Sequence, residues 1–558
     1  MSAWRVLYPC DVPGVKDDAT DTPEVGAAWT LLGECAKTPR MLSAATLPDL
    51  LRAAARQAPQ AEAFRYRAER LTYGDWDSLT DRLAAAFAAH GIGSGSVVAL
   101  LLPSTPFYLV AYLAASRLGA ATTGINARYR RTEIGHILRR SGAALLVAVD
   151  AWHDADFCTA VEPLRADLPE LRDVIWVTAD ALRTSTRGTV ETLAAGRPRA
   201  PEGGVAADDP VTIVFTSGTT GVPKGAWYTH RNILALAEID TRRYADGVIP
   251  FQKHLAAGIS FAHIGTMARI GLQIGHLGTS LIHDAFDPAA VLDVIERERL
   301  AHLGGFPTQI IMLLDHPDRP RRDLSSLRSV LLGGAPSTPE LLRRIKRELG
   351  VVISVRYSST EVGIATASLP DDPPEVLTTT VGKPTPGVEL RIVNSDNQPV
   401  PANDIGEVVV RSPATMRGYW RDPQATAATI DTQGWVHTGD LGYLDADGYL
   451  HLRGRQSEMF IRGGYNVYPA EIEDLLAKHP KVARAAVLGV PDAVFGEVGW
   501  AFIVPRAAAV PPTLAELRAF VGAELASFKR PDGLTILSDL PLTPMFKVDK
   551  RALREVQR

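Results

Sequence analysis

A buried strand that runs directly into a loop of glycines and hydroxyls is the feature that most constrains this chain. Residues Val211–Phe215 form an apolar, β-branched run typical of a fully buried strand. They are followed by Thr216–Gly221, which holds only Ser, Thr and Gly, and then by Lys224. Ligands of α/β proteins bind where strands end, and backbone N–H groups, hydroxyls and a lysine together can cradle a phosphate. We therefore expect a phosphate-binding loop here rather than a plain surface turn.

This loop is not the Walker A loop of the common nucleotide-binding proteins. That motif needs four residues between its first glycine and a Gly-Lys-Ser/Thr triplet. Here Lys224 precedes Gly225, so the order of lysine and glycine is reversed. The Walker A motif therefore does not account for the loop.

Around the loop, helical patterns alternate with short apolar strands. Trp76, Leu79, Leu83 and Phe87 share one helical face, and Gly91 follows as an expected C-terminal cap. The same alternation recurs up to Val355, which predicts a second sheet. An alternation of helices with short apolar strands is typical of parallel or mixed sheets covered by helices on both faces. The other expected elements are helices at Phe107–Leu118, Pro288–Arg299, Pro307–Leu314 and Pro339–Leu349, a helix capped by Thr132, another capped by Thr229, and strands at Val97–Leu102, Ala144–Val149, Ser329–Leu332 and Val351–Val355.

The sequence pattern changes in the C-terminal part of the chain. From Gly382, short alternating strands separated by Asp/Gly turns predict a small β-rich subdomain. Gly454 interrupts the pattern, and the residues after it alternate helix and strand in a compact α+β unit. We therefore expect an α/β protein with a large N-terminal domain, residues 1–453, built of two α/β sheet subdomains and the β-rich one. A small, mobile α+β C-terminal domain, residues 454–558, follows, and residues 1–40 form an irregular lead-in.

Length, charge and cysteine usage narrow the functional classes. A chain of 558 residues exceeds what one core supports. Its formal net charge of −4 gives no attraction to nucleic acid. The three cysteines lie far apart, which fits a reducing compartment. The most apolar stretch, Val97–Ala115, is interrupted by Pro103 and Pro106, and the first residues lack a signal-peptide core. We expect a cytoplasmic protein without a transmembrane segment.

Several polar motifs accompany the loop, and each allows a plain structural reading. Tyr357–Glu361 could place a base-stacking tyrosine, a phosphate-binding threonine and a Mg²⁺-binding glutamate together, or be a strand-to-loop turn. Asp440 could hold two ribose hydroxyls or belong to a hairpin turn. Arg455 could reach phosphate or ribose, or be solvated. Lys547, near the C-terminus, would ordinarily be a surface lysine.

Taken together and in this order, the motifs resemble those of the adenylate-forming superfamily of acyl-CoA ligases, adenylation domains and luciferases. The resemblance covers nearly the whole chain from about residue 47. The matching segments are Thr216–Gly225, Tyr357–Glu361 (YSSTE), Trp435–Asp440 (WVHTGD), Gly454–Glu473 (GRQSEMFIRGGYNVYPAEIE) and Lys547.

The resemblance implies a role for each candidate residue towards ATP. The phosphates are contacted by Thr216, Ser217, Gly218, Thr219, Thr220, Gly221 and Lys224. The adenosine is contacted by Gly333, Gly334, Ala335, Pro336, Tyr357, Asp440 and Arg455. Thr360 touches the α-phosphate, Glu361 and Thr216 hold Mg²⁺, and Lys547 bridges the carboxylate and the α-phosphate. His263 matches a position beside the carboxylate, although a packed core histidine is the plain alternative.

The resemblance also implies a second step with coenzyme A, for which the small domain rotates. Gly463 and Gly464 would then meet the pantetheine arm. Two positions depart from the family pattern: Ser457 stands at the hinge, where Asp or Lys is common, and Ser358 stands where Gly is usual.

The expected activity is an ATP-dependent acid–CoA ligase for a fatty, alicyclic or aromatic carboxylic acid, acting through an acyl-adenylate. Two alternatives remain open. One is an adenylate-forming enzyme with another acceptor: a carrier protein, an amine, or nitrite activation for diazotisation of an aryl amine. The other is a non-catalytic nucleotide-binding protein. The sequence leaves the oligomeric state open, and a homodimer is one possibility.

Overall fold

The computed structural model describes residues 41–197, 204–216, 223–244, 253–257, 260–335, 337–369, 372–543 and 547–557. The expected lead-in, residues 1–40, lies outside them. In the described segments no helix combines the length and apolarity that a membrane span needs.

A seven-stranded mixed sheet contains the strand that leads into the glycine loop. Its strand order is β20 (Gly418–Tyr419), β10 (Gly225–Thr229), β9 (Pro210–Phe215), β4 (Ala121–Ile125), β3 (Val97–Leu101), β5 (Leu145–Val149), β8 (Asp173–Val177). Strands from β9 to β8 are parallel, whereas β10 pairs antiparallel with both β9 and β20. The expected strands at Val97 and Ala144 are thus confirmed, and their residues are fully buried because helices cover the sheet.

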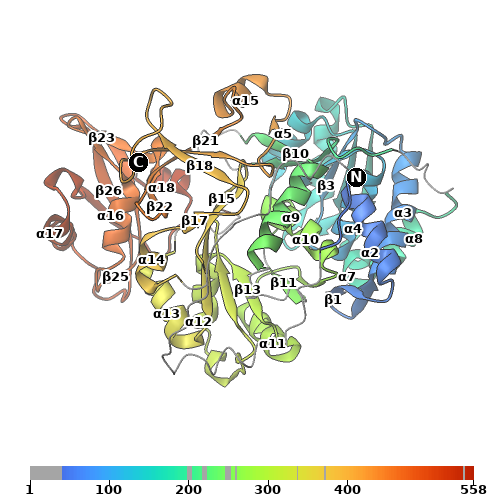
Figure 1. The fold of residues 1–558 in the computed structure, drawn as a ribbon, viewed down its shortest axis with the longest axis horizontal. Coiled ribbons are helices and arrows are strands. Elements are labelled where there is room, and N and C mark those ends of the chain that lie inside the picture. Colours follow the sequence, from blue (N-terminus) through green and yellow to red (C-terminus); the bar gives the residue numbers. More distant parts are fainter. Residues whose placement is uncertain are drawn as a thin grey trace, which may run out of the picture. The chain divides into compact units, whose positions relative to one another are not determined.

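Helices of the first part form where the sequence predicts them. In α3 (Tyr73–Ala89), Trp76, Leu79, Leu83 and Phe87 are all buried, and α3 packs against α2, α4 and α8 (Figure 1). One expected cap is wrong: α5 starts at Arg131 with Arg130 as N-cap, because Glu133 accepts from the Arg130 N–H at 2.7 Å. The helices are α2 (Leu47–Gln57), α4 (Pro106–Arg117), α5 (Arg131–Ser141), α6 (Phe157–Val161), α7 (Ala179–Thr184), α8 (Thr186–Leu193), α9 (His230–Tyr244) and α10 (Ile264–Gly275).

A second sheet confirms the second α/β run. Its order is β13 (His302–Gly305), β14 (Ser329–Leu332), β15 (Val352–Ser359), β16 (Gly363–Ala367), β17 (Lys383–Pro384). The helices beside it are α11 (Pro288–Glu298), α12 (Pro307–Leu314), α13 (Pro339–Leu349) and α14 (Pro374–Thr379). Strand β15 is longer than expected, so Tyr357 lies inside a strand and not in a turn after one. The turn reading of Tyr357–Glu361 is therefore wrong for its first residues.

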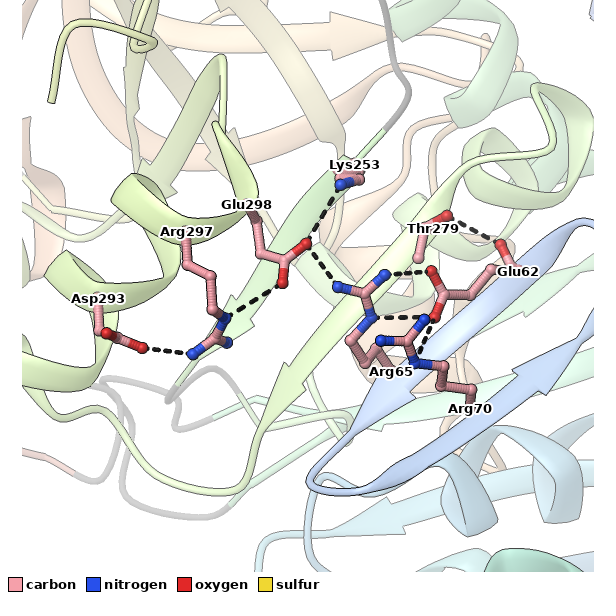
Figure 2. A network of polar contacts seen from close by, with 8 residues as sticks. All are labelled: Glu62, Arg65, Arg70, Lys253, Thr279, Asp293, Arg297 and Glu298. Atoms are coloured by element: carbon pink, nitrogen blue, oxygen red, sulfur yellow. Dashed lines mark hydrogen bonds and ion pairs between the residues drawn. The ribbon is translucent and has the colours of Figure 1, made fainter. Parts of the chain in front are cut away.

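A third sheet joins segments far apart in the chain, which the sequence did not indicate. Its order is β11 (Lys253–Ala257), β12 (Thr279–His283), β1 (Glu62–Tyr66), β2 (Glu69–Thr72). An ion-pair network ties this sheet to α11 (Figure 2). Glu298, whose side chain is 9% exposed, lies 2.5 Å from Arg65 Nη1, 3.2 Å from Lys253 Nζ and 3.3 Å from Arg297 Nε.

The β-rich subdomain and the C-terminal unit follow. The first is the antiparallel sheet β18 (Glu389–Val393), β19 (Gly406–Arg411), β21 (Val436–Leu444), β22 (Leu450–Arg455). Asp440 lies within β21, so the hairpin-turn reading of that motif is wrong.

The C-terminal sheet has the order β24 (Tyr465–Val467), β23 (Phe460–Arg462), β26 (Gly496–Pro505), β25 (Val482–Asp492), and β27 (Gly533–Ile536) pairs parallel with β26. Its elements are coloured orange to red in Figure 1. The remaining elements are α15 (Pro423–Thr429), α16 (Pro469–Leu476), α17 (Leu514–Glu524), α18 (Lys550–Gln557), the strand pair β6 (Ala151–Trp152) and β7 (Ala155–Asp156), and the short 3-10 turns η1 (Glu162–Asp167), η2 (Arg319–Arg321), η3 (Gln456–Glu458) and η4 (Ser527–Lys529).

Candidate active site

The two ends of the glycine loop are held together by the backbone. The Thr216 N–H donates to the Lys224 carbonyl at 2.9 Å, where β9 turns into the antiparallel strand β10. His136 Nε2, on α5, donates to the Pro223 carbonyl at 2.8 Å. Five predicted phosphate ligands, Ser217, Gly218, Thr219, Thr220 and Gly221, lie outside the described residues. The described ends nevertheless show a loop whose base is fixed by the sheet.

Lys224 and Glu361 are linked through a tyrosine that the sequence analysis missed. The Lys224 ammonium lies 5.0 Å from the centre of the Tyr419 ring, a cation–π contact. On the other side, the Tyr419 hydroxyl donates to Glu361 Oε1 at 3.1 Å. Burial, followed by the Glu361 charge, raises the pKa of Tyr419. The tyrosine therefore stays a neutral donor between a cation and a carboxylate.

The backbone of Thr360 and Glu361 is held from two further directions. The Tyr228 hydroxyl, on β10, donates to the Thr360 carbonyl, and the Met416 N–H donates to the Glu361 carbonyl at 2.9 Å. Strand β10 thus connects the end of the glycine loop to the Thr360–Glu361 pair.

A second polar group is centred on Asp440, which is only 6% exposed. Its Oδ2 accepts from the Tyr357 hydroxyl at 2.6 Å, and its Oδ1 lies 2.9 Å from Arg455 Nε. Burial raises the pKa of the Asp440 carboxyl, while Arg455 and Tyr357 act in the opposite direction. The carboxylate is therefore desolvated but has a polar partner on each oxygen, as buried charges need.

Gly333, Gly334 and Ala335 follow β14, with Gly334 at a φ of +78°. A Cβ at Gly334 would meet the Phe306 ring at 2.6 Å, so only glycine fits this turn without a shift. Gly333 lies near Arg356, the residue before Tyr357: a Cβ at Gly333 would be 3.7 Å from the Arg356 Cβ. The segment therefore runs beside the tyrosine that pairs with Asp440. Pro336 lies outside the described residues.

Lys547 lies within electrostatic range of both groups. The residue as a whole is exposed, yet the protein around its ammonium lowers its pKa, and the Arg455 charge lowers it further. The carboxylates of Asp440 and Glu361 act in the opposite direction. Lys547 is therefore a candidate cation for both the Glu361 group and the Asp440 group.

His263 is the N-cap of α10, where its Nδ1 accepts from the Gly265 N–H at 3.1 Å. Burial, and after it the charge of Lys547, lowers the pKa of His263 to about 4. The ring is therefore neutral at ordinary pH. Its helix-capping bond supports the structural alternative, and its electrostatic contact with Lys547 supports the site alternative.

Gly463 and Gly464 form the two-residue turn between β23 and β24, with φ of +56° and +88°. Positive φ at both positions is the signature of a tight hairpin that favours glycine. The Gly463 N–H donates to the Phe495 carbonyl at 2.8 Å. No contact among the described residues joins this turn to the Asp440 or Glu361 groups.

The described side chains of the site offer too few ligands to hold a metal ion without a substrate. The described residues contain no cluster of three or more His, Cys, Asp or Glu side chains fit to hold a metal ion. Mg²⁺ ordinarily keeps several waters and takes one or two carboxylates plus substrate phosphates. The single carboxylate of Glu361, linked through Tyr419 to the end of the glycine loop, fits that mode of binding.

Tyr419 and Tyr228 are the residues that sequence reasoning missed. Tyr228 stands three residues after Gly225, and Tyr419 stands in the aromatic segment Gly418–Trp420 just before Asp422 and α15. The sequence signal that could have identified them is an aromatic residue within a polar segment rich in turn residues. Their partners, Thr360 and Glu361, are 132 and 58 residues away, so their role depends on the fold.

Comparison with known proteins gives a consistent result. The family model described as AMP-binding enzyme matches residues 51–420, and the AMP-binding enzyme C-terminal domain matches residues 471–547. The 3-(7a-methyl-1,5-dioxo-octahydro-1H-inden-4-yl)propanoyl:CoA ligase of Mycobacterium tuberculosis is 38% identical over 525 residues, covering 92% of this chain and 99% of that protein. A feruloyl-CoA synthase of Amycolatopsis sp is 34% identical, covering 90% of this chain and 96% of that protein. The crystal structure of ATP-bound MatB from Rhodopseudomonas palustris superposes with a TM-score of 0.82 at 28% identity, over 91% of this chain and 98% of that one.

Proposed function

We propose a division of labour among the residues of the site from one premise: this chain belongs to the adenylate-forming superfamily, acyl-CoA synthetase type. Its activity is that of an AMP-forming acid–CoA ligase acting through an acyl-adenylate. Two of the relatives, the ligase of Mycobacterium tuberculosis and the feruloyl-CoA synthase, are named for ring-bearing acyl groups. A fatty, alicyclic or aromatic acid is the proposed substrate class here.

ATP is proposed to lie between the two polar groups. The loop that ends at Lys224 would surround its phosphates. Gly334 and its neighbours would border the adenine, with Tyr357 against the base. Asp440 and Arg455 would receive the ribose hydroxyls. The partnered, desolvated carboxylate of Asp440 supports this, because hydroxyl donors can join a carboxylate that already keeps a fixed orientation.

The first step makes a leaving group. A carboxylate is a poor electrophile because oxide would have to leave. One of its oxygens attacks the α-phosphorus of ATP, the bond from that phosphorus to the bridging oxygen breaks, and pyrophosphate departs with the bonding electrons. Two anions meet in this step, so preorganised positive charge lowers the barrier. Lys547 would provide it, and Thr360 would donate to the α-phosphate.

Mg²⁺ is proposed as the companion of the nucleotide, held by Glu361 and Thr216. When bound, it would neutralise phosphate charge as a Lewis acid. The chain's own part is to hold the Glu361 carboxylate, which Tyr419 does by donating to Oε1 at 3.1 Å.

The second step passes the acyl group to coenzyme A. The thiolate sulfur attacks the acyl carbon, and AMP leaves with the electrons of the broken carbon–oxygen bond. We assign Gly463 and Gly464 to the pantetheine arm, because a hairpin turn without side chains allows close approach. The small domain that presents them is proposed to begin at residue 454, with Ser457 in the hinge. A homodimer and a cytoplasmic location stay predictions.

One observation supports the assignment most strongly: Asp440 accepts from the Tyr357 hydroxyl at 2.6 Å and lies 2.9 Å from Arg455 Nε, so residues of three separate motifs form one polar group. The experiment is a panel of octanoate, cyclohexanecarboxylate and ferulate with ATP, Mg²⁺ and CoA, read as AMP and thioester. Orthophosphate and ADP as the only products would contradict adenylation.

The same panel separates the acceptors. The structure of an amide bond synthetase from Marinactinospora thermotolerans, 31% identical to this chain, superposes with a TM-score of 0.77 over 92% of this chain and all of that one. The name of that enzyme describes amide formation. Pyrophosphate release that CoA does not convert to thioester would favour such an acceptor here.

A further inference from the structure

Lys547 is fixed through its backbone and that of its neighbour Val548. The Thr543 N–H donates to the Lys547 carbonyl at 2.7 Å, and the Lys547 N–H donates back to Thr543 Oγ1 at 3.3 Å. Next to them, Leu542 and Val548 pair as an isolated antiparallel bridge. The backbone of Lys547 is therefore fixed to that of Thr543.

Helix α18 continues from this segment without a break. Asp549 Oδ1 accepts from the Arg551 and Ala552 N–H groups at 3.0 and 3.1 Å, so it caps the helix. Leu553 is fully buried with Phe502 and Leu540 in a small apolar cluster. The loop thus has a rigid base on its C-terminal side.

Lys550, three residues after Lys547, connects this base to the segment where the domain boundary is expected. Its Nζ lies 2.7 Å from Glu458 Oε2 and 3.1 Å from Glu473 Oε1. Glu458 ends η3, the turn that contains Ser457, and Glu473 belongs to α16. Glu473 Oε1 also accepts from the Val487 N–H at 2.8 Å, which fixes this carboxylate to β25.

The ion pairs are partly shielded from solvent. The side chains of Lys550, Glu458 and Glu473 are 21%, 29% and 22% exposed. Burial opposes the charge of Lys550, but Glu473 and Glu458 outweigh it and raise the pKa of Lys550. One cation therefore bridges two carboxylates from different elements.

We infer that Lys550 is a positioning residue for the adenylation step: its bridge from Glu458 to Glu473 makes the Lys547 loop, η3 and α16 move as one body. The ammonium of Lys547 then occupies the site whenever the turn at Ser457 holds the small domain in place. This inference rests on the proposed role of Lys547 in adenylation. All the contacts that carry it lie within residues 458–553.

Lys550→Met tests this role, because methionine keeps most of the side-chain volume and removes the charge. Pyrophosphate release with the best acid of the octanoate, cyclohexanecarboxylate and ferulate panel should fall about 100-fold in kcat, the scale of a misplaced catalytic group. The KM for ATP should stay near that of the wild type. Thioester formation from the supplied acyl-adenylate of the same acid should be unchanged.

Two variants control for charge and helix stability. Arg551→Met removes an exposed cation from the adjacent position of α18 and should behave like the wild type. Lys550→Arg keeps the charge and should retain most of the adenylation rate. Equal loss of both half-reactions in Lys550→Met, or an unchanged adenylation rate, would overturn the inference.

Glu458→Gln provides a second route if Lys550→Met does not fold. It should slow adenylation in the same selective way, and the double variant should be no slower than the slower single one, because both remove one interaction. Fully multiplicative losses would overturn the bridge. Lys547→Ala distinguishes a failure of the proposed role of Lys547 from a failure of the inferred role of Lys550. Wild-type adenylation in this variant would refute the role of Lys547 itself, whatever the Lys550 variants do.

Discussion

Tyr357 donates its hydroxyl proton to Oδ2 of Asp440 at 2.6 Å, across 83 residues of sequence. The two residues come from β15 and β21, strands of different sheets. The bond orients a buried carboxylate whose other oxygen pairs with Arg455 at 2.9 Å. Two motifs that are weak singly are thus joined into one polar group.

Tyr357→Phe should therefore weaken ATP binding without removing the aromatic ring. A hydrogen bond to a charged group contributes about 1.5–3 kcal/mol, so the KM for ATP should rise about tenfold or more. Initial rates against ATP concentration measure this. Tyr443→Phe, in the same strand as Asp440, is the matched control and should leave the KM unchanged. Equal effects of both variants would contradict a specific role for the Tyr357 hydroxyl.

Tyr419→Phe should affect the nucleotide site at the Glu361 side. The ring remains beneath Lys224, but the hydroxyl that donates to Glu361 Oε1 is lost. We expect adenylation to slow about tenfold, the effect of one hydrogen bond to a carboxylate. The loss should appear as a higher Mg²⁺ requirement in a titration of pyrophosphate release. An unchanged Mg²⁺ dependence would show that the hydroxyl does not prepare the carboxylate.

His230 should make stability fall between pH 6.5 and pH 4. The residue is 1% exposed, and its Nδ1 accepts from the Leu47 N–H at 3.2 Å. Burial lowers the pKa of His230 from 6.5 to about 4. Below pH 6.5 the unfolded chain takes up a proton that the native histidine refuses, so the free energy of unfolding falls until about pH 4.

Denaturant unfolding at pH 6.5 and pH 5 tests this. His230 alone should account for a loss of about 1.6 kcal/mol between the two values. In His230→Gln that part of the loss should disappear, whereas His153→Asn, at an exposed histidine, should keep the wild-type pH dependence. If His230→Gln lost as much stability as the wild type, the neutral buried state would be refuted.

Glu298 should stabilise the fold at neutral pH through the network shown in Figure 2. Burial opposes its ionisation, but Arg65, Lys253 and Arg297 outweigh it and lower the pKa of Glu298 from 4.5 to about 2. Its contribution is therefore complete above pH 4.5 and is lost as the pH falls towards 2.

Glu298→Gln should lower the free energy of unfolding at pH 7 by about 3 kcal/mol, because three cations lose a largely buried partner. Glu340→Gln is the control: its carboxylate is 48% exposed and pairs with Arg343 on the surface, so its loss should cost about 0.5 kcal/mol or less. Chemical denaturation followed by circular dichroism measures both. Equal costs would show that the network adds nothing beyond surface ion pairs.

Local patterns predicted much of the fold. The bounds Pro307–Leu314, Ser329–Leu332 and Pro339–Leu349 match the structure residue for residue. Proline at a helix start and the period of apolar residues act over a few positions, so the sequence shows them directly. The N-cap of α5 was misplaced because Thr132 and Arg130 compete within one turn, and the Glu133 carboxylate decides between them.

What the sequence by itself determined is the set of chemical groups: a glycine loop with Lys224, a Thr-Glu pair, Asp440 and a terminal lysine. Only the tertiary structure decided how they meet. Tyr419 reaches Glu361, β1 pairs with β12 across more than 200 residues, and Lys550 connects the Lys547 loop to Glu458. Such pairings depend on strand register and on the packing of whole elements, and neither is encoded in the few residues on either side of a motif.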